Sequence, residues 1–181
     1  ITAPPLTGGA NSTTQAFTFT STESGSTFQC QLDGSVFAPC TSPTTYSGLS
    51  VSTHTFAVRA IDSSGNVDPT PASYTWRIDL TAPTATLTAP AAGATLALTT
   101  TLGATASDDV GVVGVQFKLD GVNLGSEDKT APYTLSWNTR TATSGPHTVS
   151  VVARDLGGNT ATSSAAITVD NNGAIGPGLQ A

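Results

Sequence analysis

The segment Phe28-Gln29-Cys30-Gln31-Leu32-Asp33-Gly34 is matched in the second half of the chain by Val115-Gln116-Phe117-Lys118-Leu119-Asp120-Gly121. Both segments end in Asp-Gly and are followed by further short apolar alternation. Asp-Gly between alternating segments is a strong hairpin signal, because a type I′ turn needs positive φ at both central residues. Each segment therefore predicts a β-strand that runs into a tight turn.

Two more blocks repeat in the same order, which indicates an internal duplication. His54-Thr55-Phe56-Ala57-Val58 corresponds to His147-Thr148-Val149-Ser150-Val151, and Trp76-Arg77-Ile78-Asp79 corresponds to Ile167-Thr168-Val169-Asp170. The same alignment carries Asp62, Gly65 and Asn66 onto Asp155, Gly158 and Asn159. Three matches in order predict two related modules in tandem.

Period-two alternation is the dominant pattern in both modules and predicts half-buried strands. It places Phe56, Val58 and Ala60 on one face of a strand, and Thr55, Ala57 and Arg59 on the other. The residues that the same pattern assigns to buried faces elsewhere are Phe17, Phe19, Tyr74, Trp76, Ile78, Tyr133, Leu135, Trp137, Val149, Val151, Ala153, Ala165, Ile167 and Val169. Ser150 and Arg154 are assigned to the outer face. Many short strands with regular turns and no helical stripe predict an all-β chain of two Greek-key sandwiches.

The repeat also sets the expected boundaries. We expect module one over residues 1–79, a linker over 80–83, module two over 84–170, and a flexible Gly-rich tail over 171–181. Ile1-Thr2-Ala3-Pro4 is similar to the linker Leu80-Thr81-Ala82-Pro83, and the proline would hold either segment extended. The sequence is thus expected to be a segment of a longer array.

Composition narrows the classes of function. Charged residues make up only 10% of the 181 residues, and the net charge of −6 leaves six basic residues scattered over the chain. Nucleic-acid binding needs clustered Lys and Arg, so that class is excluded. No apolar run approaches the length of a membrane span and no signal peptide opens the sequence.

The sequence from Phe28 to Asp79, with FQCQLDG, THTFAVRAIDSSGN and YTWRID, resembles the bacterial immunoglobulin-like repeats of large secreted proteins. PTATLTAP, VQFKLDG and HTVSVVARDLGGNT in the second half resemble a sister group of such modules. The resemblance covers nearly all of residues 4–170. It implies two tandem immunoglobulin-like sandwiches outside the cell that serve as spacers, stalks, adhesin repeats or accessory domains.

Cys30 and Cys40 are the only cysteines. With the turn at Asp33-Gly34, Cys30 would face Phe37 and Cys40 would lie just beyond the paired region, so a bulge or bend is needed to join the sulfurs. We predict a Cys30–Cys40 disulfide; two unpaired thiols are the alternative. The second module has Phe117 in place of Cys30 and must depend on its core.

No catalytic set is apparent. His54 and His147 occupy equivalent positions before equivalent strands, which favours a structural role, and neither accompanies a nucleophile motif such as G-x-S-x-G. We predict no enzyme activity and no required cofactor. The one metal hypothesis is calcium, because carboxylates in loops supply the oxygen ligands that it needs.

The calcium candidates are Asp62, Asp79, Asp108 and Asp109, with Asp79 at the junction of the modules. The alternative is that these residues head turns by binding their own backbone.

Two further hypotheses concern binding. A carbohydrate-binding accessory module would need exposed aromatic rings, but alternation assigns Trp76 and Trp137 to the cores and leaves Tyr46 as the best exposed candidate. Self-association through Thr-rich edge strands or the tail would suit a subunit of a filament, a surface layer or a phage particle. The sequence favours a non-catalytic structural, spacer or adhesive segment of an extracellular protein, with neighbouring modules of the same chain as partners.

Overall fold

The computed structural model describes residues 9–172, and the chain divides into two compact units, Ile1–Leu80 and Thr81–Ala181. The division falls between Leu80 and Thr81, inside the segment 80–83 that the sequence assigns to the linker. The predicted linker-like segment at residues 1–4 lies outside the described residues, as does the predicted tail from residue 173 onward. No helix within residues 9–172 is both long enough and apolar enough to cross a membrane.

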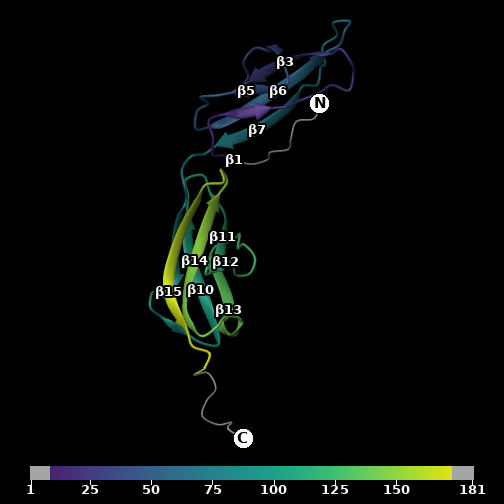
Figure 1. Cartoon of the computed structure of the whole chain (residues 1–181). Coiled ribbons are helices and arrows are strands. Elements are labelled where there is room, and N and C mark those ends of the chain that lie inside the picture. Colours follow the sequence, from purple (N-terminus) through teal and green to yellow (C-terminus); the bar gives the residue numbers. More distant parts are fainter. Residues whose placement is uncertain (1–8, 173–181) are drawn as a thin grey trace. The chain divides into compact units, whose positions relative to one another are not determined.

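Unit 1 is built from short strands (Figure 1). They are β1 (Gly9–Ala10), β2 (Gln15–Phe17), β3 (Thr27–Leu32), β4 (Ala38–Cys40), β5 (Thr44–Tyr46), β6 (Thr53–Ile61) and β7 (Ala72–Ile78). One sheet has the order β1-β7-β6-β3-β4, and the second sheet pairs β2 with β5.

Unit 2 repeats this plan with longer strands. They are β8 (Thr84–Ala89), β9 (Thr95–Leu96), β10 (Thr99–Ser107), β11 (Val112–Leu119), β12 (Val122–Asn123), β13 (Tyr133–Asn138), β14 (Gly145–Asp155) and β15 (Thr160–Val169), with a 3₁₀ turn at Thr139–Thr141. The sheets have the orders β12-β11-β14-β15-β9 and β13-β10-β8. The first sheet of each unit has the same strand order, including a short parallel strand, β1 or β9, on the last strand of the unit. The predicted all-β, immunoglobulin-like sandwich is confirmed.

Each unit has its own core, and the predicted alternation fills it. In unit 1 the core combines Phe17 of the small sheet with Phe56, Val58, Trp76 and Ile78 of the large one. The core of unit 2 contains Leu102, Val115, Phe117, Tyr133, Trp137, Val149, Val151, Ala153, Ile167 and Val169. Burial of large apolar side chains from two facing sheets is the main source of stability in such a sandwich.

One residue on the outer face is unexpectedly buried. Ala57, placed on that face of β6 by the alternation, is only 8% exposed. β6 lies between β3 and β7, and Ala57 has Gln31 and Ser73 as its direct cross-strand neighbours. Directly opposite residues share a face, so these longer side chains shield the small methyl group.

The Asp-Gly turns have the predicted backbone. Asp33 and Gly34 have φ of 51° and 72°, and Asp120 and Gly121 have φ of 49° and 82°. In the first turn the Ser35 N–H donates to the Leu32 carbonyl at 3.0 Å, which closes the turn. Positive φ at both central positions is what a type I′ turn requires.

Cys30 and Cys40 form a disulfide, with their Cα atoms 5.8 Å apart. The pairing around it differs from the expected register, because Cys30 lies opposite Ala38, not Phe37, and Cys40 lies opposite Phe28 inside the paired region. One extra residue between the Asp33-Gly34 turn and β4 shifts the register by one position. The two cysteines then become diagonal neighbours on one face, where a bridge can form.

Candidate functional site

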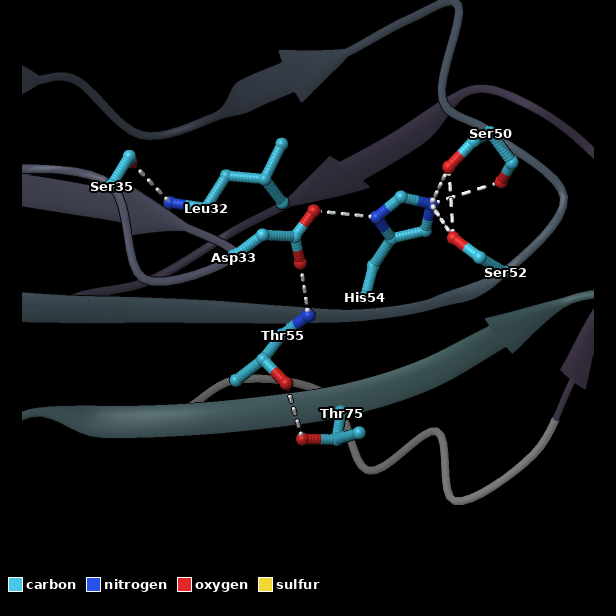
Figure 2. A network of polar contacts seen from close by, with 8 residues as sticks. All are labelled: Leu32, Asp33, Ser35, Ser50, Ser52, His54, Thr55 and Thr75. Atoms are coloured by element: carbon cyan, nitrogen blue, oxygen red, sulfur yellow. Dashed lines mark hydrogen bonds and ion pairs between the residues drawn. The ribbon is translucent and has the colours of Figure 1, made fainter.

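Within residues 9–172, a network of hydrogen bonds joins the Asp33-Gly34 turn to the start of β6. Figure 2 shows Asp33 reaching from the turn toward His54, and Ser50 and Ser52 on the far side of the imidazole. His54 is one of few polar residues buried within the described part of the chain, at 5% exposure. A buried His-Asp pair next to two serines is a possible catalytic arrangement, and its geometry decides whether it can act as one.

The Asp33 carboxylate binds two partners at once. Its Oδ2 accepts a hydrogen bond from His54 Nδ1 at 2.7 Å, and its Oδ1 accepts one from the Thr55 N–H at 2.8 Å. The Asp33 N–H in turn donates to the Thr55 carbonyl at 2.8 Å. Asp33 thus fixes both the ring of His54 and the backbone of the residue after it.

The other imidazole nitrogen is also occupied. Nε2 of His54 lies 2.9 Å from the Ser50 carbonyl oxygen, and at 3.3 Å and 3.4 Å from the hydroxyls of Ser52 and Ser50. A carbonyl oxygen can only accept, so Nε2 carries a hydrogen and donates it. Since Nδ1 donates to a carboxylate at the same time, the geometry favours the doubly protonated, cationic ring.

The electrostatics agree with this geometry. The hydrogen bonds to Asp33 and to the Ser50 carbonyl raise the pKa of His54 above 6.5 and outweigh burial, which opposes the charge. Partial burial alone would raise the pKa of Asp33, but hydrogen bonds from His54 and Thr55 together lower it below 3.8. Both changes favour an imidazolium–carboxylate pair at neutral pH.

Unit 2 contains the same network at the equivalent positions. His147 Nδ1 donates to Asp120 Oδ2 at 2.6 Å, and the Thr148 N–H donates to Asp120 Oδ1 at 2.8 Å. His147 Nε2 lies 2.8 Å from the Thr143 carbonyl oxygen. Hydrogen bonds to Asp120 and Thr143 raise the pKa of His147, as in unit 1.

In residue types, Asp33, His54 and Ser52 match a hydrolase triad, but their arrangement does not suit one. A general base must take a proton from the serine on an unprotonated Nε2. Here Nε2 has its shortest contact, 2.9 Å, with a carbonyl oxygen, and the serine hydroxyls lie farther away. The arrangement locks a turn and is not arranged to activate a nucleophile, in agreement with the structural role predicted for both histidines.

A second repeated arrangement involves the calcium candidate Asp62 and its equivalent Asp155. Asp62 Oδ1 accepts from the N–H groups of Ser64 and Asn66, both at 2.8 Å, and Oδ2 accepts from Asn66 Nδ2 at 2.7 Å. Asp155 accepts from the backbone N–H and Nδ2 of Asn159 in the same way. Both residues head turns through their own backbone, which is the alternative that the sequence left open.

The other calcium candidates lie in different units. Asp79, at the end of β7, is 1% exposed, and its N–H donates to the Ala10 carbonyl at 2.9 Å. In unit 2, Asp108 Oδ2 accepts from the N–H groups of Val110 and Gly111, while its buried Oδ1 has no hydrogen-bond partner among the residues the structure covers. Asp109 is exposed. Calcium binding by these residues stays a prediction.

The aromatic residues all fall within residues 9–172, and none of them is exposed there. Trp76 and Trp137 are 3% and 4% exposed, as predicted. Tyr46, expected to be the exposed ring, is half-buried, with its ring centroid 6.3 Å from that of Phe17 and 6.0 Å from that of Phe56. That expectation is wrong because β5 presents Tyr46 to the core of unit 1.

The sequence predicts the turns at Asp33 and Asp120 but not the pairing of these residues with His54 and His147. The signal for the pairing is the joint repetition of Asp-Gly and His-Thr in both modules.

Comparison with known proteins agrees with this fold. Residues 83–151 match the family model described as a bacterial Ig domain. The fibronectin(III)-like modules of Clostridium thermocellum CbhA are similar over 99% of this chain and 98% of theirs, with 23% identity and a TM-score of 0.73. The FN1-FN3 domains of chicken CNTN1 are similar over 90% of this chain and 66% of theirs, with 12% identity and a TM-score of 0.51. A search of curated protein sequences finds no match. The resemblance to bacterial Ig-like modules is confirmed for unit 2, and the solved structures support the fold of the whole chain.

Proposed function

We propose that this chain is a non-catalytic structural segment, a spacer of two immunoglobulin-like modules in an extracellular multidomain protein. The observation that carries the proposal is the paired network Asp33–His54 and Asp120–His147. In each module the imidazole and carboxylate that could take part in catalysis instead form hydrogen bonds that hold a turn against a strand. Duplication of this arrangement suits a mechanical building block and gives neither module a separate active site.

The bacterial Ig match of residues 83–151 supports the extracellular part of the proposal, since such modules commonly occur in secreted and surface proteins. The Cys30–Cys40 disulfide supports it independently, because disulfides persist in oxidising compartments. A protease or biotinylation assay on intact cells tests the location, and protection of the chain from both reagents would contradict it.

The spacer role itself is tested by replacement in the protein that contains this chain. Residues 9–172 would be exchanged for an unrelated pair of immunoglobulin-like modules of equal length. A spacer predicts that the activity of the whole protein is retained, whereas deletion of the segment lowers it. Loss of activity on replacement, with normal expression and export, would indicate a specific binding role.

The carbohydrate-binding alternative receives no support from the aromatic residues, none of which is exposed in the described part of the chain. Aromatic platforms supply most of the contact area in stacking interactions with sugar rings. A pull-down of the full chain on insoluble polysaccharides would test this alternative, and specific retention would reinstate it.

Calcium binding is a subsidiary proposal. Asp108 has one carboxylate oxygen that is buried without a hydrogen-bond partner among residues 9–172, and a hard cation would satisfy such a group. A melting scan with calcium and then with EDTA tests it. We expect calcium to raise the melting temperature of the wild-type chain and not of an Asp108→Asn variant; an unchanged melting curve would remove the proposal.

A further inference from the structure

Both hairpin turns contain an Asp-Gly peptide, a dipeptide that is prone to spontaneous isomerisation to isoaspartate. The glycine nitrogen attacks Cγ of the aspartic acid, a new C–N bond closes a five-membered succinimide ring, and one carboxyl oxygen leaves as water. Water then opens the ring at the main-chain carbonyl, which breaks the original peptide bond and leaves the chain linked through Cγ. Glycine favours the attack because it has no side chain. Asp33-Gly34 and Asp120-Gly121 are therefore at risk of this change.

Burial and packing do not shield the two turns. The side chains of Asp33 and Asp120 are 44% and 49% exposed, so water reaches both carboxyl groups. A side chain added at Gly34 or Gly121 would meet no atom within 4 Å beyond its chain neighbours. Any protection of these peptides must therefore come from the backbone conformation and from hydrogen bonds.

The turn backbone holds the reacting atoms apart. The φ angles of Asp33 and Asp120 are 51° and 49°, and the first central residue of a type I′ turn has ψ of about +30°. In an L-residue this ψ gives the Cβ–Cα–C–N torsion a value of about 150°, which places the next nitrogen almost opposite Cβ. Ring closure needs this torsion near zero, so that the nitrogen touches Cγ. The aspartate must leave the turn conformation before the ring can close.

The hydrogen bonds of the carboxylate oppose that rotation. Oδ2 of Asp33 accepts from Nδ1 of His54 at 2.7 Å, and Oδ1 accepts from the Thr55 N–H at 2.8 Å. The Asp120 carboxylate accepts the equivalent two bonds at 2.6 Å and 2.8 Å. All these donors lie on a neighbouring strand, so a carboxylate that turns toward its glycine must break its bonds. The same bonds favour the anion, whereas loss of water in ring closure requires the neutral acid.

We propose that Asp33 and Asp120 are latent sites of isoaspartate formation, and that His54 and His147 suppress the reaction by holding each carboxylate on the neighbouring strand. His54 is well placed for this, since its Nε2 also donates to the Ser50 carbonyl at 2.9 Å and the ring is held at both nitrogens. The histidines are positioning residues, and water is the only reactant that the isomerisation needs. The inference concerns the chemical durability of the turns and does not depend on the proposed spacer role.

Prolonged incubation of the full chain at neutral pH and physiological temperature tests the proposal. Isoaspartate would be located by proteolysis and mass spectrometry with electron-transfer fragmentation. The peptides QLDGSV (residues 31–36) and KLDGVN (residues 118–123) supply the rates of the unprotected sequences. We expect both sites of the wild-type chain to isomerise at least about tenfold more slowly than the peptides. Equal rates in chain and peptides would overturn the proposal.

Two variants separate the roles of the histidines. His54→Ala should raise the rate at Asp33 by about tenfold, the factor expected from loss of one hydrogen bond to a charged group, and should leave Asp120 unchanged. His147→Ala should have the converse effect. Each variant thus contains its own control site. An unchanged rate at the aspartate beside the replaced histidine would contradict the proposal.

A core variant distinguishes positioning from a general loss of stability. Val58→Ala weakens the core of unit 1 and leaves the contact between Asp33 and His54 in place. Urea unfolding gives the unfolded fraction of each variant, and rates are compared at equal fractions. We expect faster isomerisation in His54→Ala than in Val58→Ala; equal rates would show that folding alone protects the turn and would overturn the proposal. If His54→Ala does not fold, His147→Ala and Val151→Ala provide the same comparison in unit 2.

Discussion

Nδ1 of His54 lies 2.7 Å from Oδ2 of Asp33, and this contact ties the tip of the β3–β4 hairpin to the first residues of β6. The two residues are separated by 20 others in the sequence, and the same contact recurs between His147 and Asp120. In both modules it links a turn to a strand on which large core residues follow directly. The contact is therefore best understood through its effect on stability.

Replacement of His54 by Ala should destabilise unit 1. The change removes hydrogen bonds to a carboxylate and a carbonyl and leaves the Ser50 carbonyl without this partner, which costs about 1–3 kcal/mol by analogy with other charge-assisted bonds. It also removes the contact of the imidazole with Trp76, whose ring centroid is 5.4 Å away. Urea unfolding of the variant measures the loss.

The matched variant is His147→Ala in unit 2. His147 is more exposed than His54, with side-chain exposures of 11% and 5%. We expect a smaller loss of unfolding free energy for His147→Ala, because water can replace more of its interactions. Equal stability of wild type and both variants would show that the networks do not hold the turns.

The stability of both units should depend on pH in a defined direction. The folded-state pKa values of His54 and His147 are raised, mainly by hydrogen bonds to Asp33 and Asp120. Their contribution is fully present below the unfolded pKa of about 6.5, and it is lost as the pH rises through the raised folded values. Unfolding free energy should therefore fall as the pH rises from about 6.5 through the raised histidine pKa values.

Asp33 and Asp120 act in the opposite sense. Their pKa values are lowered in the folded state, so their contribution to stability is present above about pH 3.8 and is lost as the pH falls through the lowered values.

NMR titration of the imidazole Cε1–H signals measures the pKa values of His54 and His147 directly. Values at or below 6.5 would contradict the doubly donating geometry.

Much of this fold is readable from local sequence, whereas the networks are not. The Asp33-Gly34 turn and the face of Phe56 follow from two-residue preferences and strand periodicity. The burial of Ala57 depends on the size of its cross-strand neighbours Gln31 and Ser73, which periodicity does not encode. The Asp33–His54 contact needs the register between β3 and β6, and that register is a property of the folded sheet.

The Cys30–Cys40 disulfide also shows that the register between strands does not follow from local sequence. The pairing of the only two cysteines was predicted, but the facing residues were not, because a single extra residue before β4 moves every partner by one position.

Removal of the disulfide should destabilise unit 1 selectively. The bridge spans a sequence separation of 10 residues. Closure of a loop of this size lowers the entropy of the unfolded chain and so stabilises the folded state by about 2–3 kcal/mol in the chain-entropy model. The double variant Cys30→Ala and Cys40→Ala should lower the unfolding free energy of unit 1 by that amount. Reduction of the wild type should have the same effect, with the unfolding of unit 2 unchanged. An equal loss in both units would contradict this selectivity.

The arrangement of Asp33, His54 and Ser52 should be chemically inert as a nucleophilic site. A fluorophosphonate probe reacts with serines whose proton is taken by a neighbouring base, and Nε2 of His54 already donates to the Ser50 carbonyl at 2.9 Å. We therefore expect no labelling of the full chain, and a Ser52→Ala variant should differ from wild type by no more than about 0.5 kcal/mol in stability. The comparison is informative at alkaline pH, where His54 loses its extra proton and any latent reactivity should be greatest. Labelling of wild type that disappears in Ser52→Ala would show that the network activates the serine, and would require a catalytic function in place of the structural one.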